Sequence, residues 1–159
     1  MPLPPAAPRD QVMSPNPEFA GRTHGPSAPY EVSRVKIAEF ATAIGEQSPL
    51  CFDKTAAQAA GYPDVIAPPT FAIVVSAASS GGLVRDPDFG INYAMVVHGE
   101  QSFDHARPLH AGDVVTATTT VEQIRPIGKH TSVMFRTEIS TTDGELVCTA
   151  RNVLVERGE

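Results

Sequence analysis

The fold is decided by residues 131–150, which read TSVMFRTEISTTDGELVCTA. From 131 to 140, apolar and polar side chains alternate, as expected for a strand that buries one face. The predicted inward set is Val133, Phe135, Thr137 and Ile139, and the predicted outward set is Met134, Arg136, Glu138 and Ser140. The pair Asp143-Gly144 then favours a tight turn, because these residue types suit the backbone of a short hairpin. The stretch therefore predicts two long antiparallel strands.

Segments of the same texture surround this hairpin. Residues 96–107, 113–124 and 145–156 are long and rich in Val, Thr and Ile. Turn residues separate them at Ala111-Gly112-Asp113 and at Pro126-Ile127-Gly128. The second half of the chain is therefore expected to form an antiparallel meander.

Helical signals precede the strands. After a short predicted strand at 30–32, the residues Ile37, Phe40, Ala41 and Ile44 fall at i, i+3, i+4 and i+7, which is one apolar stripe of a helix. Gly45 marks the end of this helix. A second short helix is expected over residues 54–60, with Asp53 as its N-cap and Gly61 as its C-terminal stop.

Residues 67–78 form the most apolar part of the chain. Proline is compatible with the first turn of a helix, and Pro68-Pro69 lie where that turn would begin. The β-branched run 73–75 would also suit a strand, but the length of the segment and its flanking Gly81-Gly82 favour a helix. Since the segment is apolar on nearly every side, that helix is expected to be buried.

Helices followed by an antiparallel sheet indicate the α+β class. A single long sheet that wraps one mostly buried helix is the plan of the hot-dog fold. Such a sheet leaves an exposed edge, and pairing with a second copy or a related subunit is the simplest way to cover it. We therefore expect a dimer.

Length and composition agree with one globular domain. The chain has 159 residues, of which 42% are hydrophobic and 19% charged. Eight of its fifteen prolines fall within the first thirty residues. Residues 1–17 are therefore expected to be an extended, poorly ordered tail, and 18–159 a single domain.

Charge and cysteine content exclude several functions. The formal net charge of −6 argues against a general nucleic-acid binder, which must neutralise phosphates. No apolar run is long enough to span a membrane, and MPLPPAAPRD does not resemble a secretory signal, so a cytoplasmic protein is expected. Cys51 and Cys148 lack the spacing of a zinc site or a disulfide framework. His98 and His110 lack a third partner at metal spacing, so no metal is expected.

Three motifs together carry a resemblance to a known family. Residues 45–51, GEQSPLC, resemble the hydratase motif of MaoC-like enzymes, which reads Gly-Asp-x-Asn-Pro-aliphatic-His. Residues 67–71, APPTF, resemble the start of the central hot-dog helix, and 107–113, RPLHAGD, resemble a turn before a strand in the same superfamily. With Gly21-Arg22-Thr23 and Tyr30-Glu31-Val32, the resemblance covers roughly residues 20–156. The chain is similar to the fatty-acid-synthase-like dehydratase N-terminal family, which includes accessory subunits of two-component (3R)-hydroxyacyl-thioester dehydratases.

The chain departs from that family's catalytic pattern at four positions. Glu46 stands at the position of the motif Asp, and its carboxylate is one methylene further from the backbone. Cys51 stands at the position of the motif His, where a thiol with an ordinary pKa of about 8.5 suits neutral acid/base work poorly. Ser48 replaces the motif Asn. Pro69 lies where active members have a Gly whose N–H polarises the thioester carbonyl, and proline has no N–H.

Each of these residues also has a plain structural interpretation. Glu46 after a helix is more often a solvated carboxylate. Cys51 is then a small, partly buried hydrophobe, and Pro68-Pro69 only start a helix. Arg107 before Pro108 could face a phosphopantetheine phosphate, but a surface ion pair is the more frequent role.

The resemblance and the departures together favour a subunit of a (3R)-hydroxyacyl-ACP or -CoA dehydratase that shapes the acyl-chain site. A MaoC-like partner would supply the catalytic Asp and His, and the acyl tunnel would be lined by Phe71, Val74, Val75 and Ala78. No metal or redox cofactor is implied, because β-elimination needs an acid/base pair and a carbonyl clamp. Two alternatives stay open. One is a self-sufficient homodimeric dehydratase that uses Glu46, and the other is a non-enzymatic hot-dog protein that binds acyl thioesters.

Overall fold

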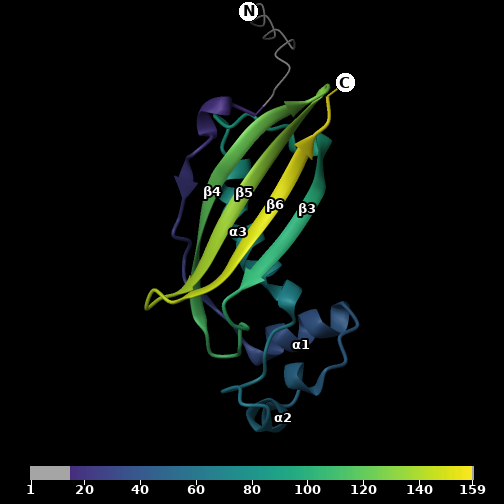
Figure 1. The fold of residues 1–159 in the computed structure, drawn as a ribbon, viewed down its shortest axis with the longest axis vertical. Coiled ribbons are helices and arrows are strands. Elements are labelled where there is room, and N and C mark those ends of the chain that lie inside the picture. The colour runs from purple at the N-terminus through teal and green to yellow at the C-terminus, as the bar shows by residue number, and fades with distance from the viewer. Residues whose placement is uncertain (1–14, 159) are drawn as a thin grey trace, which may run out of the picture.

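The computed structural model describes residues 15–158 (Figure 1). The strands are β1 Thr23–His24, β2 Tyr30–Glu31, β3 Val96–His105, β4 Val114–Ile127, β5 His130–Thr141 and β6 Leu146–Glu156. The α-helices are α1 Arg34–Ala43, α2 Lys54–Ala59 and α3 Ala72–Val84, and short 3-10 helices are η1 Pro17–Phe19, η2 Pro49–Cys51, η3 Pro69–Phe71 and η4 Tyr93–Met95. The predicted α+β class is confirmed.

The strands form one antiparallel sheet in the order β1-β4-β5-β6-β3, with β2 also paired to β4. Strands β4, β5 and β6 are the expected meander. The prediction was wrong for β3, which pairs with β6 rather than with β4. The connection of residues 106–113 carries the chain across the end of the sheet instead of turning back on β3. As a result β3 is the free edge (Figure 1).

Two turns shape the meander. The hairpin predicted at Asp143-Gly144 is present, and the Gly144 amide donates to the Thr141 carbonyl at 2.9 Å. The turn between β4 and β5 lies later than predicted. Pro126 is still in β4, opposite Thr131, and the chain reverses after Ile127, with Gly128 at a φ of +60°. A positive φ suits glycine, so this glycine makes the turn.

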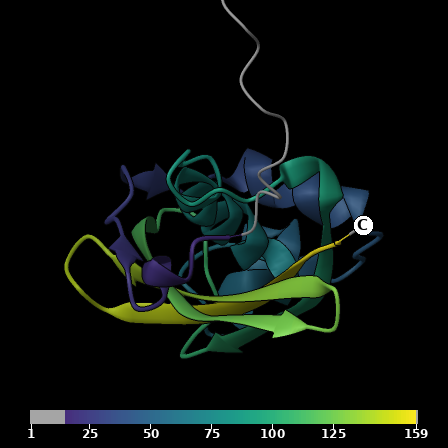
Figure 2. The same cartoon turned by 90° about the horizontal axis from the view of Figure 1, so that it is seen from above.

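Helix α3 lies across the inner face of the sheet, as the hot-dog fold requires (Figure 2). It continues to Val84, so Gly81-Gly82, which were expected to flank the helix, lie inside it. The reason is close packing. A Cβ atom at Gly82 would stand 2.4 Å from the Nε2 atom of His24 on β1. Because Gly82 has no side chain, β1 can pack closely against α3 at this position, and the helix continues past it.

The core has two apolar clusters separated by a layer of hydroxyl groups. One cluster includes Phe71 and Ile139, and the other includes Phe89 and Phe135. Between them the Thr119 hydroxyl donates to Ser79 Oγ at 2.9 Å and lies 2.8 Å from Thr137 Oγ1. All three side chains are buried. The layer joins α3 to β4 and β5 and satisfies its own buried polar groups.

Helices α1 and α2 stand beyond one end of the sheet (Figure 1). The predicted cap is present, since Asp53 accepts from the Thr55 amide at 2.7 Å, and Ser33 caps α1 by accepting from the Lys36 amide. Asp64 fastens this part of the chain, since it binds Arg34 of α1 at 2.7 Å and Lys54 of α2 at 3.4 Å. The Arg34 hydrogen bond holds the pKa of the Asp64 carboxyl well below its usual range.

The domain begins slightly earlier than the predicted boundary at residue 18. Pro15 is buried, and the Asn16 amide donates to the Phe89 carbonyl at 2.8 Å. Residues 15–17 therefore belong to the folded part, and Pro17 starts η1. Residues 1–14 of the predicted tail lie outside the described residues. Within the described range, no helix is both long and apolar enough to cross a membrane.

Candidate functional site

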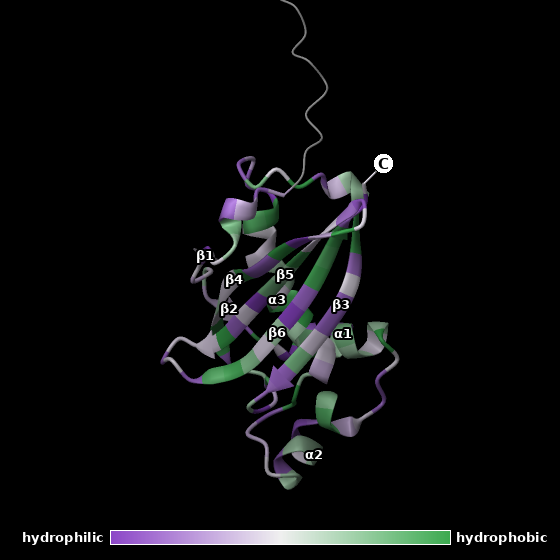
Figure 3. Cartoon of the chain, turned by 45° about the horizontal axis from the view of Figure 1, so that its top comes forward, coloured by the Kyte–Doolittle hydropathy of each residue, from purple (hydrophilic) through white to green (hydrophobic). Residues whose placement is uncertain are grey.

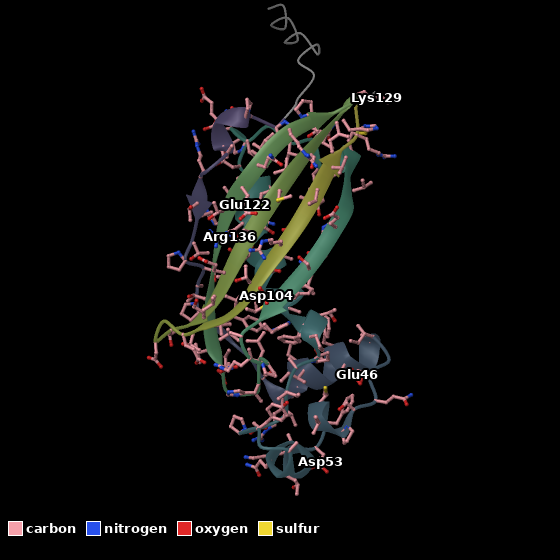
Figure 4. All side chains as sticks on the ribbon, viewed as in Figure 1. Glu46, Asp53, Asp104, Glu122, Lys129 and Arg136 are labelled. Atoms are coloured by element: carbon pink, nitrogen blue, oxygen red, sulfur yellow. The ribbon has the colours of Figure 1, made fainter. Side chains whose placement is uncertain are left out.

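The hydratase-like motif forms the loop between α1 and η2. Gly45 ends α1 with a φ of +74°. Glu46 then turns its carboxylate back onto the loop, where Oε1 accepts from the Gln47 amide at 2.9 Å and from the Ser48 amide at 2.8 Å (Figure 4). Ser48 in turn caps η2 through the Leu50 amide. The Glu46 carboxylate therefore stabilises its own loop in this structure.

Cys51 is the last residue of the motif, and its side chain lies in the core. Its exposed fraction is 4%, and it packs in the cluster that contains Phe71. Burial raises the pKa of the Cys51 thiol, and the nearby negative charge of Glu46 raises it further. The fold thus brings Glu46 and Cys51 near each other, as the motif predicts. However, the thiol is held in its neutral form, which is a poor nucleophile and a poor base.

The start of the central helix is built from Pro68 and Pro69. Pro68 is buried, and Pro69 is the first residue of η3. The Pro69 carbonyl accepts a hydrogen bond from Nε2 of His105, at 2.8 Å. Because a carbonyl can only accept, this bond places the His105 proton on Nε2. Pro69 offers no N–H at this turn, so it cannot donate to a thioester carbonyl.

A groove of about 550 Å³ lies between α3 and the β3–β6 side of the sheet. Its walls are Ile73, Ser76, Ala77, Ser80, Gly81, Val84, Arg85, Tyr93, Val96, His98, Gln101, Asn152 and Leu154. The four residues expected to line an acyl tunnel are not among them. Phe71 and Val75 are buried in the core, while Val74 is half-buried and Ala78 is exposed. A helix that is apolar all round does not reveal which of its faces meets the sheet, and contact of these four residues with an acyl chain stays a prediction.

A β-bulge supplies polar groups to this groove that the sequence analysis missed. On β3, His98 lies opposite Leu154 and Glu100 opposite Val153, so Gly99 is an extra residue in the strand. Without a bulge, His98 and Gln101 would point to opposite faces of the sheet, because side chains alternate along a strand. With it, both line the groove. A glycine inside a predicted strand was the available signal.

Arg107 forms the ion pair that the sequence analysis favoured. Its guanidinium binds Asp113 Oδ2 at 2.8 Å and Oδ1 at 2.9 Å, and Glu145 Oε1 at 2.9 Å. These hydrogen bonds raise the pKa of Arg107 and lower that of Glu145. The cluster ties the connection after β3 to the β5–β6 hairpin. With its donors so engaged, Arg107 is not free to bind a phosphate.

The histidines do not assemble into a metal site. His98 lines the groove, whereas Nε2 of His110 lies 3.3 Å from Asp113 in the Arg107 cluster. In the part of the chain that the structure describes, no three His, Cys, Asp or Glu side chains converge as metal ligands. That the protein needs no metal or other cofactor stays a prediction.

Comparison with known proteins identifies the family. Residues 18–150 match the model of the FAS1-like, dehydratase domain region. The chain belongs to this family. It is also 49% identical over 140 residues to a UPF0336 protein of Saccharopolyspora erythraea, covering 88% of this chain and 90% of the relative. A UPF0336 protein of Thermobifida fusca is 46% identical over 147 residues, covering 92% of this chain and 97% of the relative.

Solved structures of dehydratases share the fold. A chain of the C-terminally truncated HadBC (3R-hydroxyacyl-ACP dehydratase) complex of Mycobacterium tuberculosis superposes with a TM-score of 0.79 and 28% identity, covering 86% of this chain and 96% of that one. A MaoC-like dehydratase gives a TM-score of 0.81 and 26% identity, covering 88% of this chain but 42% of the other. The FAS1-like dehydratase family and the hot-dog fold are thus both established for this chain.

Proposed function

We propose that this FAS1-like dehydratase domain is the acyl-site subunit of a two-subunit (3R)-hydroxyacyl-ACP or -CoA dehydratase, with catalysis supplied by a MaoC-like partner. The observation that carries the proposal is the state of the motif loop. Glu46 is bound to two amides of its own loop, and Cys51 is buried with a raised pKa. The loop therefore lacks an acid/base pair poised for chemistry.

The reaction explains why this matters. Dehydration of a 3-hydroxyacyl thioester removes a proton from the α-carbon and expels the β-hydroxyl as water, so it needs a base, an acid and a donor to the thioester carbonyl. Loss of one positioned acid/base group costs about 10²–10⁴ in rate. Loss of one carbonyl donor, as at Pro69, costs about 10²–10³. The partner's Asp and His provide the proton transfers in this proposal, and no metal or redox cofactor takes part.

The subunit's own task is to hold the acyl chain of a fatty-acid thioester. The groove along α3 is open and partly apolar, with Ile73, Val84 and Leu154 in its walls. A volume of about 550 Å³ lies within the usual size range of small-molecule sites. This groove replaces the buried Phe71 and Val75 as the acyl-binding wall. The HadBC complex, which resembles this chain, is a dehydratase complex, and this similarity supports a dehydratase partner here.

The test is hydration of crotonyl-CoA and crotonyl-ACP, the reverse of the dehydration. The isolated chain is expected to run near the buffer blank, and a co-expressed complex with a MaoC-like subunit is expected to turn over. The triple variant Glu46→Asp, Cys51→His and Pro69→Gly is expected to recover part of the activity in the isolated chain, whereas each single change is not. Turnover of several per second by the isolated wild-type chain would contradict the proposal and favour a self-sufficient homodimer.

A further inference from the structure

Strand β3 is an open edge with a defined outer face. Residues opposite each other in a sheet share a face, so the register with β6 assigns every β3 side chain. Ser102 lies opposite Arg151, Glu100 opposite Val153 and Asp104 opposite Thr149. Arg151 and Val153 border a hollow on the outer side together with Glu100 and Ser102. The outer row of β3 is therefore Val97, Glu100, Ser102 and Asp104.

This outer row carries only negative charge. Strand β3 contains Glu100 and Asp104 but no Lys or Arg between 96 and 105. Both carboxylates belong to exposed residues, and hydrophilic colour predominates along the strand (Figure 3). Arg151 on β6 lies diagonal to both acids and is one cation for two anions. The next strand outward therefore meets a surplus of negative charge.

The neighbouring strands do not neutralise that surplus. Arg136 of β5, which lies opposite Arg151, binds Glu122 of β4 at 2.9 Å and also binds Glu138 (Figure 4). It is thus engaged on the side of the sheet away from β3. Glu122 and Glu138 engage Arg136, so Arg151 of β6 is left as the base that faces the two acids of β3. Bases on a strand that pairs with β3 would balance the remaining negative charge.

A second copy of this chain does not supply these bases. The longest antiparallel pairings of β3 with itself are centred on Glu100 or Gln101, the middle of the strand. In the first, the Glu100 side chains of the two copies face each other. In the second, Glu100 of one copy is diagonal to both Glu100 and Asp104 of the other. Like charges at such positions destabilise strand pairing, and a two-fold axis doubles the effect.

We propose that β3 is a charge-selective docking edge for a related but non-identical hot-dog subunit, whose edge strand presents Lys or Arg on its outer face. Val97, in the same outer row and with an exposed fraction of 43%, supplies apolar contact area. This inference rests on the proposed function, and it names the charge that the dehydratase partner must carry. Repulsion between Glu100 and Asp104 of two copies disfavours pairing of β3 with itself, and attraction to Lys or Arg favours pairing with that partner.

The test uses this chain as its own probe. A charge-reversed variant, Glu100→Lys with Asp104→Lys, is mixed with ¹⁵N-labelled wild-type chain, and the dimers are counted by native mass spectrometry. The mixed dimer is expected to be about tenfold tighter than either homodimer, because opposite charges then meet across the edge. A matched control, Glu39→Lys with Asp88→Lys, changes two exposed acids outside β3 by the same net charge and is expected to show no preference.

Neutral variants test the proposal even if the charge-reversed chain does not fold. Glu100→Gln with Asp104→Asn removes the repulsion and is expected to strengthen self-association above that of wild type. Mixed and wild-type dimers of equal stability would overturn the proposal. So would mixtures that stay monomeric, since the acids would then only block association. Both readouts measure association without catalysis, so a complex that forms but does not hydrate crotonyl thioesters would contradict the proposed function alone.

Discussion

Replacement of Glu46 by Ala tests whether the Glu46 carboxylate has a structural role. Oε1 of Glu46 accepts from two backbone amides, at 2.9 Å and 2.8 Å, in a half-buried loop. Loss of a comparable side-chain cap costs about 0.5–2 kcal/mol. For a domain of this size, a loss of about 0.5–2 kcal/mol lowers Tm by about 1–8 °C. Glu46→Ala is therefore expected to lower Tm by that amount, measured by differential scanning calorimetry.

Two controls sharpen this measurement. Glu39→Ala removes an exposed carboxylate on α1 that only meets Lys36 at 3.4 Å, and it is expected to leave Tm nearly unchanged. Glu46→Gln keeps an Oε1 acceptor and is expected to lose less stability than Glu46→Ala. Hydrogen exchange at the amides of Gln47 and Ser48 should rise in Glu46→Ala. An unchanged Tm together with unchanged exchange at these amides would refute the structural role assigned to Glu46.

Three further predictions concern the scaffold. Thr119→Val removes the hydroxyl that joins Ser79 to Thr137, leaving Ser79 its 3.4 Å bond to the Ala117 carbonyl, and should lower the free energy of unfolding by about 1–3 kcal/mol in urea titrations. Burial raises the pKa of Cys148 to about 11, so the folded state keeps a proton that the unfolded state loses near pH 9; stability should fall between about pH 9 and 11, and less steeply in Cys148→Ala. Asp64→Ala releases α1 and α2, so hydrogen exchange should rise in these helices and stay constant in β4–β6.

Local patterns predicted most of the elements because local physics determines them. The alternation at 133–140 reflects a strand that buries one face, and β5 spans it. Asp53 and Gly61 mark α2 correctly, since a cap needs a short acceptor side chain and the end of this helix needs a positive φ, which is +94° at Gly61. These signals depend on residues that are neighbours in the sequence, so a single sequence is enough to predict these elements.

The errors arise where distant contacts decide. Gly82 resembles a helix stop until His24 is known to pack against it. The place of β3 beside β6 depends on a connection that crosses the sheet, which alternation does not encode. The burial of Phe71 and Val75 likewise depends on the position of the sheet, which their apolar character does not encode. Gly45 marked the end of α1 correctly, but the hydrogen bonds of Glu46 to the amides of its own loop were not predicted.

The central claim, that this chain does not perform the proton transfers, is tested most directly by kcat of the two-subunit complex with Glu46→Gln in this chain. The substitution keeps the size and the Oε1 acceptor of the side chain while it removes its ability to act as a base. The complex is expected to hydrate crotonyl-CoA with kcat within about twofold of wild type, because the partner's carboxylate and imidazole do the chemistry. A fall in kcat of about 10²-fold or more, in a complex that still assembles, would contradict the claim and make Glu46 the catalytic base.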